Sequence, residues 1–119
     1  MMPYERLEAW TAVRHLAVAV YRATEQWPSS ERFGMTSQIR RAAISACANL
    51  AEGSARKGCR EFGRFLDIAL GSLAEASALM TVAADLGYLP REELDALRTT
   101  QQKAGRLVWG LHQAIRRKA

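Results

Sequence analysis

Residues 62–83 read FGRFLDIALGSLAEASALMTVA, and their apolar side chains recur at alternating steps of four and three. This spacing places them on one face of an α-helix, in the heptad pattern of helices that pack along an apolar seam. The chain shows no period-two alternation rich in Val, Ile and Thr, which would be typical of strands. The stretch predicts one long helix with the seam Phe62, Leu66, Ala69, Leu73, Ala76, Met80 and Ala83.

Three further helices are predicted around this one. Apolar residues at steps of three and four cover residues 4–26, 32–55 and 91–117. Pro28 and Pro90 separate helices, because proline cannot continue a helical hydrogen-bond pattern. Short connections between long helices favour antiparallel neighbours. We therefore expect an all-α fold, an antiparallel up-down-up-down four-helix bundle, with one domain over residues 1–119.

The ends of the helix that contains residues 62–83 are marked by glycines. Gly58 lies near its start, where no Ser or Thr is present to cap the first turn, so we expect a weak cap. Gly87 is expected to adopt the left-handed conformation that commonly ends a helix.

Composition limits the class of protein. The chain has 119 residues, of which 49% are hydrophobic and 24% are charged, as in an average globular domain. No uninterrupted apolar run approaches the roughly 18 residues of a membrane span, and the first residues carry acids where a signal peptide would be basic. We expect a cytoplasmic protein with no membrane partner. Cys47 and Cys59 are too few for a disulfide framework and are expected to stay reduced.

No catalytic or metal-binding motif is found. His15 and His112 lack carboxylates or cysteines at metal-ligand spacing, and Ser45 and Ser72 do not lie in a nucleophile elbow. The glycines follow no strand and form no phosphate-binding loop. We expect no enzyme activity, no cofactor and no metal.

Three polar residues, Asn49, Glu52 and Glu75, lie beside the apolar seams. Buried polar groups need hydrogen-bond partners, so a network that fixes helix register is the first interpretation. The alternative is a catalytic pair of Glu52 and Glu75, since two adjacent carboxylates separate each other's pKa values.

Charge is arranged in blocks along the chain. The net charges of residues 1–31, 32–66, 67–95 and 96–119 are −1, +5, −5 and +6. Arginine suits phosphate because its planar fork donates two parallel hydrogen bonds. The predicted nucleic-acid-binding residues are Arg40, Arg41, Arg56, Lys57, Arg60 and Arg64. Alternatively, these charges pair with Asp67, Glu75, Asp85 and the acids near residue 92, or are simply solvated.

The last basic run, Arg116, Arg117 and Lys118, suits the negative end of a helix dipole. It is interpreted as a solvated tail that would also add to nonspecific nucleic-acid affinity.

Some apolar residues lie outside the seams. Trp109 and Tyr21 follow seam positions by one residue, so they could pack in an oligomer or stack on bases. Leu16, Phe65, Leu70, Leu79 and Leu107 widen the apolar faces. This breadth predicts that protomers bury a second surface against one another.

The sequence resembles a known family in several stretches. These are QIRRAAISACANLAEG at 38–53, EFGRFLDIALGSLAE at 61–75, LEAW at 7–10, VYRATEQWPSSERFG at 20–34 and LGYLP at 86–90. They are similar to small bacterial four-helix bundle proteins named after their genes in intervening sequences of large-subunit ribosomal RNA. Ala46 and Cys47 depart from the Ile and Pro that are usual there.

The resemblance implies a ring-like homo-oligomer, most simply a homopentamer. A related branch is the accessory variability determinant of diversity-generating retroelements, which is understood to bind a reverse transcriptase and nucleic acid. Two functions are therefore expected. One is a noncatalytic adaptor that binds RNA or DNA through its basic patch. The alternative is a protein-interaction scaffold or accessory subunit, for example of a reverse transcriptase, without nucleic-acid affinity of its own.

Overall fold

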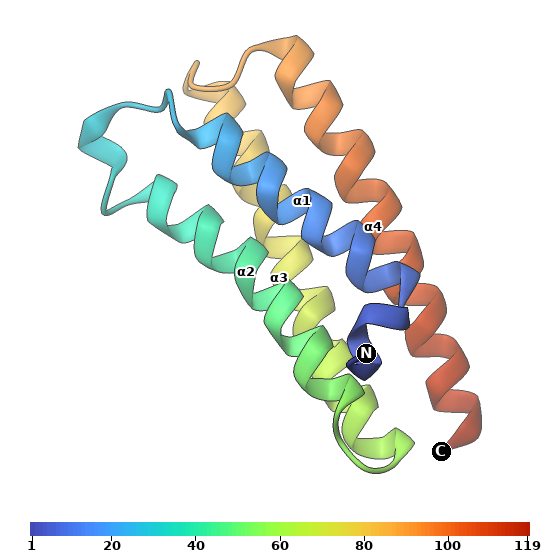
Figure 1. Ribbon diagram of the computed structural model, residues 1–119. Coiled ribbons are helices and arrows are strands. Elements are labelled where there is room, and N and C mark those ends of the chain that lie inside the picture. The colour runs from blue at the N-terminus through green and yellow to red at the C-terminus, as the bar shows by residue number, and fades with distance from the viewer.

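Four long helices make up the computed structural model, which describes residues 1–119 (Figure 1). They are α1 (Glu8–Thr24), α2 (Met35–Ser54), α3 (Cys59–Asp85) and α4 (Arg91–Lys118). Two short 3-10 helices, η1 (Pro3–Arg6) and η2 (Ser29–Glu31), precede α1 and α2, and there is no strand. The all-α class with four helices is confirmed.

Each helix packs against two others. α1 contacts α2 and α4, and α3 contacts the same two helices from the other side. The most extensive contact joins α2 and α3, which are connected by a short turn. The bundle is elongated, with principal extents of 44 × 24 × 23 Å (Figure 1).

The core follows the predicted seams. In α3, Leu66, Ala69, Leu73, Ala76, Met80 and Ala83 are buried, whereas Phe62, at the first turn, is only half-buried. The alanine-rich face of α2 is buried as well, which permits the close approach of α3. The buried residues of this face are Ile39, Ala42, Ala43, Ala46 and Leu50.

Packing within the protomer accounts for part of the width of the apolar faces, and the predicted second surface between protomers stays a prediction. Leu16 is fully buried inside the protomer. Leu70, Leu79 and Leu107 are half-buried and pack against the same core, and Phe65 contacts α2 at Gly53. In a bundle of four helices each helix has two neighbours, so its apolar face must be wider than one seam.

The two glycines behave as predicted. Gly58 precedes α3 with φ 88°, and no side chain caps the first turn of α3. Gly87 has φ 80°, and Tyr88 beyond it donates its backbone N–H to the carbonyl of Ala83 at 2.9 Å, closing α3.

Glu31 connects the start of α2 to the α3–α4 turn. One carboxylate oxygen accepts the backbone N–H of Met35 at 3.2 Å, and the other accepts the hydroxyl of Tyr88 at 3.0 Å. The hydrogen bond to Glu31 raises the pKa of the Tyr88 hydroxyl. These two bonds hold the loop between α1 and α2 in place.

By length and composition alone, α3 could cross a membrane. The same properties are typical of a core helix in a bundle. The seam of α3 packs against α2 and α4, so its apolar character is explained in part by the fold.

Candidate nucleic-acid interface

The six predicted binding residues do not form one surface. Arg40 and Arg41 lie in the first half of α2, whereas the other four surround the α2–α3 turn. Arg56 follows Arg41 by 15 residues. At the rise of an α-helix this corresponds to about 22 Å. The two groups are therefore too far apart to form one binding surface.

Arg40 is engaged inside the protomer. Its Nε donates to the hydroxyl of Thr24 at 2.8 Å, and its Nη2 donates to the carbonyl oxygen of Tyr21 at 3.2 Å. The guanidinium also lies 4.6 Å from the centroid of the Tyr21 ring. Carbonyls in the last turn of a helix lack partners within the helix, and a cation there favours the helix dipole. Arg40 thus connects the end of α1 to α2, and its guanidinium is not free to bind a phosphate.

Replacing Arg40 with alanine is expected to lower the free energy of unfolding by about 1–2 kcal/mol, because two hydrogen bonds to a charged group are lost at a half-buried position. Urea denaturation measures the change. Arg41→Ala is the matched control, since Arg41 is exposed and no carboxylate lies within ion-pair distance of it. Equal stability of the two variants would contradict the structural role of Arg40.

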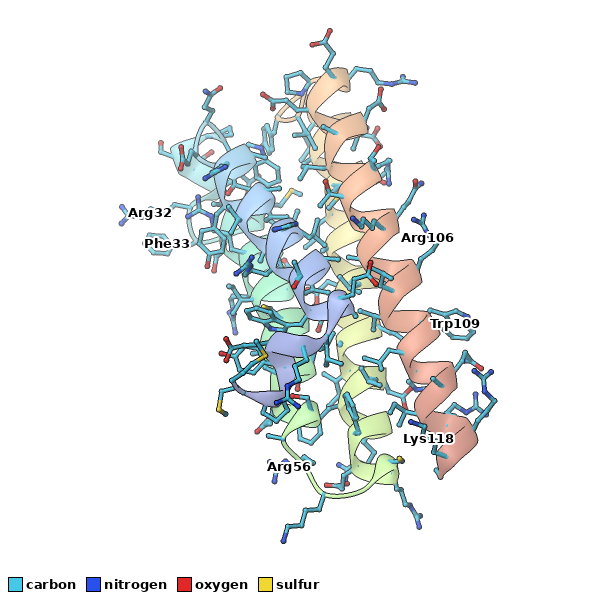
Figure 2. The ribbon with its side chains drawn as sticks, turned by 45° about the vertical axis from the view of Figure 1, so that its right-hand side comes forward. Arg32, Phe33, Arg56, Arg106, Trp109 and Lys118 are labelled. Atoms are coloured by element: carbon cyan, nitrogen blue, oxygen red, sulfur yellow. The ribbon has the colours of Figure 1, made fainter.

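The remaining four residues share one end of the bundle with the last turn of α4. A groove of about 300 Å³ at this end is lined by Arg60 and Arg64 from α3 and by Arg116 from α4. Figure 2 shows Arg56 and Lys118 at the same end of the molecule. We call this surface the basic end and define it as Arg56, Lys57, Arg60, Arg64, Arg116, Arg117 and Lys118.

Most charges of the basic end have no partner within the chain. Arg56 pairs with Glu52 at 3.3 Å, and Arg64 pairs with Glu61 at 3.1 Å, both at exposed positions of a single helix. Exposed ion pairs of this kind contribute little to stability and leave the arginines accessible. The other five bases, Lys57, Arg60, Arg116, Arg117 and Lys118, have no carboxylate within 4.0 Å.

None of the acids expected to neutralise these bases forms an ion pair with them, although Asp67 lines the same groove as Arg60 and Arg64. Asp67 contacts His112, Glu75 accepts a hydrogen bond from Gln38, and Asp95 pairs with Arg91. Several acids lie around the end of α3 and the start of α4, at the far end of the bundle (Figure 1). This acidic end comprises Glu25, Glu31, Asp85, Glu92, Glu93 and Asp95. The acids of residues 85–95 and the bases around the α2–α3 turn thus lie at opposite ends of the long axis, although Arg32 and Arg91 share the acidic end and Asp67 lies at the basic end.

His112 is buried beside the basic end. The residues near it in the chain gave no indication of this environment. His112 is 6% exposed, and its Nε2 lies 2.8 Å from a carboxylate oxygen of Asp67. Its Nδ1 is buried without a hydrogen-bond partner, and the Trp109 ring stacks on it at 6.3 Å. Asp67 precedes it by 45 residues, so only the packing of α3 on α4 reveals the pair. No nucleophile is hydrogen-bonded to the pair.

The polar residues beside the seams form a smaller network than predicted. Asn49 donates to the carbonyl and hydroxyl oxygens of Ser45 at 2.8 and 3.1 Å. Ser72 donates to the same hydroxyl at 3.0 Å and so connects α3 to α2. Glu75 connects the same two helices separately, by accepting a hydrogen bond from Gln38 at 3.4 Å, whereas Glu52 contacts only Arg56.

The alternative, a carboxylate pair, is wrong. Glu52 contacts Arg56, whereas Glu75 contacts Gln38, which lies 14 residues earlier than Glu52 on the same helix. That separation corresponds to about 21 Å along α2, so the two carboxylates cannot share a proton.

Neither cysteine is in a disulfide, and no three residues of His, Cys, Asp or Glu are grouped closely enough to hold a metal ion. Burial raises the pKa of the Cys47 thiol, which keeps it in the unreactive protonated form.

Known proteins show a related sequence and fold. Residues 5–110 match the family described as 23S rRNA-intervening sequence protein. A solved structure of a protein with unknown function from the S23 ribosomal protein family of Bacteroides thetaiotaomicron VPI-5482 superposes with a TM-score of 0.78. The two are 20% identical, and the likeness covers 87% of this chain and 97% of that chain. No curated protein matches. The chain belongs to the 23S rRNA-intervening sequence protein family.

Proposed function

We propose that this protein is a noncatalytic, homo-oligomeric adaptor that binds RNA or DNA through the basic end of each protomer. The observation that carries this proposal is the group of five bases at one end of the bundle without carboxylate partners. A protein charge that is not neutralised within the chain is free to replace the counterions of a phosphate backbone.

The local backbone adds to the attraction. α3 begins at Cys59, inside the basic end, and no side chain caps its first turn. The first N–H groups of a helix point outward and carry the positive end of the helix dipole. Together with Arg60 and Arg64 they favour a phosphate at this position.

A homo-oligomer would carry several copies of the basic end. Three apolar side chains on α2 and α3 leave nearly half of their surface exposed: Ile44, Ile68 and Val82. A second copy that covers them would remove apolar surface from water. We propose an up-down-up-down protomer in a cytoplasmic ring, with five copies by resemblance. Several basic ends in one ring would bind one nucleic acid with increased avidity.

The acidic end favours a second function, the accessory subunit. Its side chains lie away from the basic end and offer a surface for a basic protein partner, for example a polymerase of the reverse transcriptase class. This function requires no nucleic-acid affinity.

Sedimentation velocity with a fluorescent structured RNA tests the adaptor. We expect free protein to sediment at a multiple of the 13.2 kDa protomer and the RNA to co-sediment with it at physiological salt. A monomer that leaves the RNA unshifted even at low salt would refute both parts of the proposal. An oligomer that leaves the RNA unshifted would favour the accessory subunit.

A further inference from the structure

A polar groove lies between α2 and α3, away from the basic end. Its volume is about 530 Å³, within the usual range of small-molecule sites. It begins at the α1–α2 loop and follows the first half of α2. Its lining includes Phe33, Ser37, Gln38, Arg41, Ser72 and Glu75.

Phe33 is the most unusual residue of this groove. Its side chain is 90% exposed, and it points away from the bundle with Arg32 beside it (Figure 2). The Arg32 guanidinium lies 5.4 Å from the centroid of the ring. Phenylalanine normally buries most of its surface, and this ring packs in no core. The exposed face is therefore available to an aromatic ligand.

The groove offers polar groups suited to the edge of a base. Gln38 donates to Glu75 at 3.4 Å, which leaves its amide oxygen free to accept a hydrogen bond. Ser72 is held in place by its bond to Ser45. Glu75 supplies an acceptor, which favours ring N–H and amino donors of a base and disfavours a phosphate at the same point.

Arg41 supplies the charge for a phosphate. It lines the groove, is exposed and has no ion-pair partner. Arg32, whose guanidinium lies over the Phe33 ring, is a second cation nearby. An aromatic platform, a polar edge and a nearby arginine are the groups with which proteins bind unpaired nucleotides.

We propose that this groove binds a nucleoside phosphate whose base is unpaired. The base stacks on Phe33, its edge contacts Gln38 and Glu75, and its phosphate contacts Arg41. This inference rests on the proposed function where the nucleotide belongs to an RNA or DNA strand. A free nucleotide has the same chemistry, and the experiment separates the two sources.

The experiment compares three ligands: a labelled mixed-sequence 12-nucleotide RNA, the same RNA as a duplex, and the four ribonucleoside monophosphates. Phe33→Leu keeps an apolar side chain and removes the aromatic face, whereas Phe33→Trp keeps that face. Because Phe33 is exposed, both variants are expected to fold as the native protein does. We expect Phe33→Leu to weaken binding of the unpaired RNA by about 5-fold to 100-fold, with duplex binding unchanged and with affinity restored in Phe33→Trp.

The outcomes separate the two proposals. Monophosphate binding that Phe33→Leu abolishes would support the groove and identify a free nucleotide, even if the wild-type protein bound neither RNA, which would refute the adaptor alone. Unchanged affinity of Phe33→Leu for the unpaired RNA and the monophosphates would overturn the groove and leave the basic end untouched. A changed sedimentation mass in Phe33→Leu would also overturn it, because Phe33 would then contact a second copy.

Discussion

The triple variant Lys57→Glu, Arg60→Glu and Arg116→Glu is expected to weaken binding to structured RNA by about a hundredfold or more at physiological salt. Each of these side chains is free of an ion pair, so each loses a phosphate contact and places a negative charge in its position. Their exposure predicts an unchanged fold. Fluorescence anisotropy with labelled RNA measures the affinity, and circular dichroism checks the helix content.

A matched control has the same change in net charge elsewhere. Arg22, Lys103 and Arg106 are exposed on α1 and α4, outside the basic end, and have no carboxylate partners. Their triple replacement with Glu is expected to weaken binding only a few-fold, through the general field of the protein. If both triple variants lose affinity equally, the basic end is not the interface.

Gly53→Leu is expected to lower the free energy of unfolding by about 3 kcal/mol, because it inserts a side chain into a close contact between α2 and α3. Gly53 is buried on α2, and a Cβ atom built on it would lie 2.6 Å from the Cβ of Phe65 and 3.1 Å from the Cδ1 of Phe62. A side chain at this position therefore requires α2 and α3 to move apart or Phe65 to shift. Urea denaturation measures the loss.

Gly110→Ala is the control, because it measures how much replacing a glycine within a helix changes stability when no neighbour is in the way. A Cβ at Gly110 would meet nothing within 4 Å, so alanine there is expected to raise the free energy of unfolding by up to about 1 kcal/mol. Gly53→Ala is expected to be destabilising, in contrast to Gly110→Ala. A stabilised Gly53→Ala would show that α2 and α3 do not approach as closely as described.

The regular parts of the fold could be predicted because their pattern is local. The spacing of Leu66, Leu73 and Met80 predicts that they are buried, and Gly58 and Gly87 mark the two ends of α3. The start of α1 could not be predicted as well. The helix was expected from about residue 4, but Pro3–Arg6 forms a 3-10 helix and Leu7 is extended, so α1 begins only at Glu8.

The roles of individual polar side chains could not be predicted, because they depend on which helices become neighbours. Arg40 and Arg41 are adjacent in sequence, yet one caps α1 and the other faces solvent. Arg116 was interpreted as part of a solvated tail, but the fold places it with Arg60 and Arg64. Phe33 could not be singled out either, because the helix was expected to begin at about residue 32, whereas α2 begins at Met35 and leaves Phe33 in the preceding loop.

The most direct test of the basic end as a nucleic-acid interface is the dependence of RNA affinity on salt, measured for the wild-type protein and the basic-end triple variant. The slope of log affinity against log salt is about −0.7 to −0.9 for each phosphate contacted. We predict a steep slope for the wild-type protein that becomes shallower by about two to three in the variant, one contact for each base replaced. A slope near zero, or the same slope in both proteins, would contradict the account.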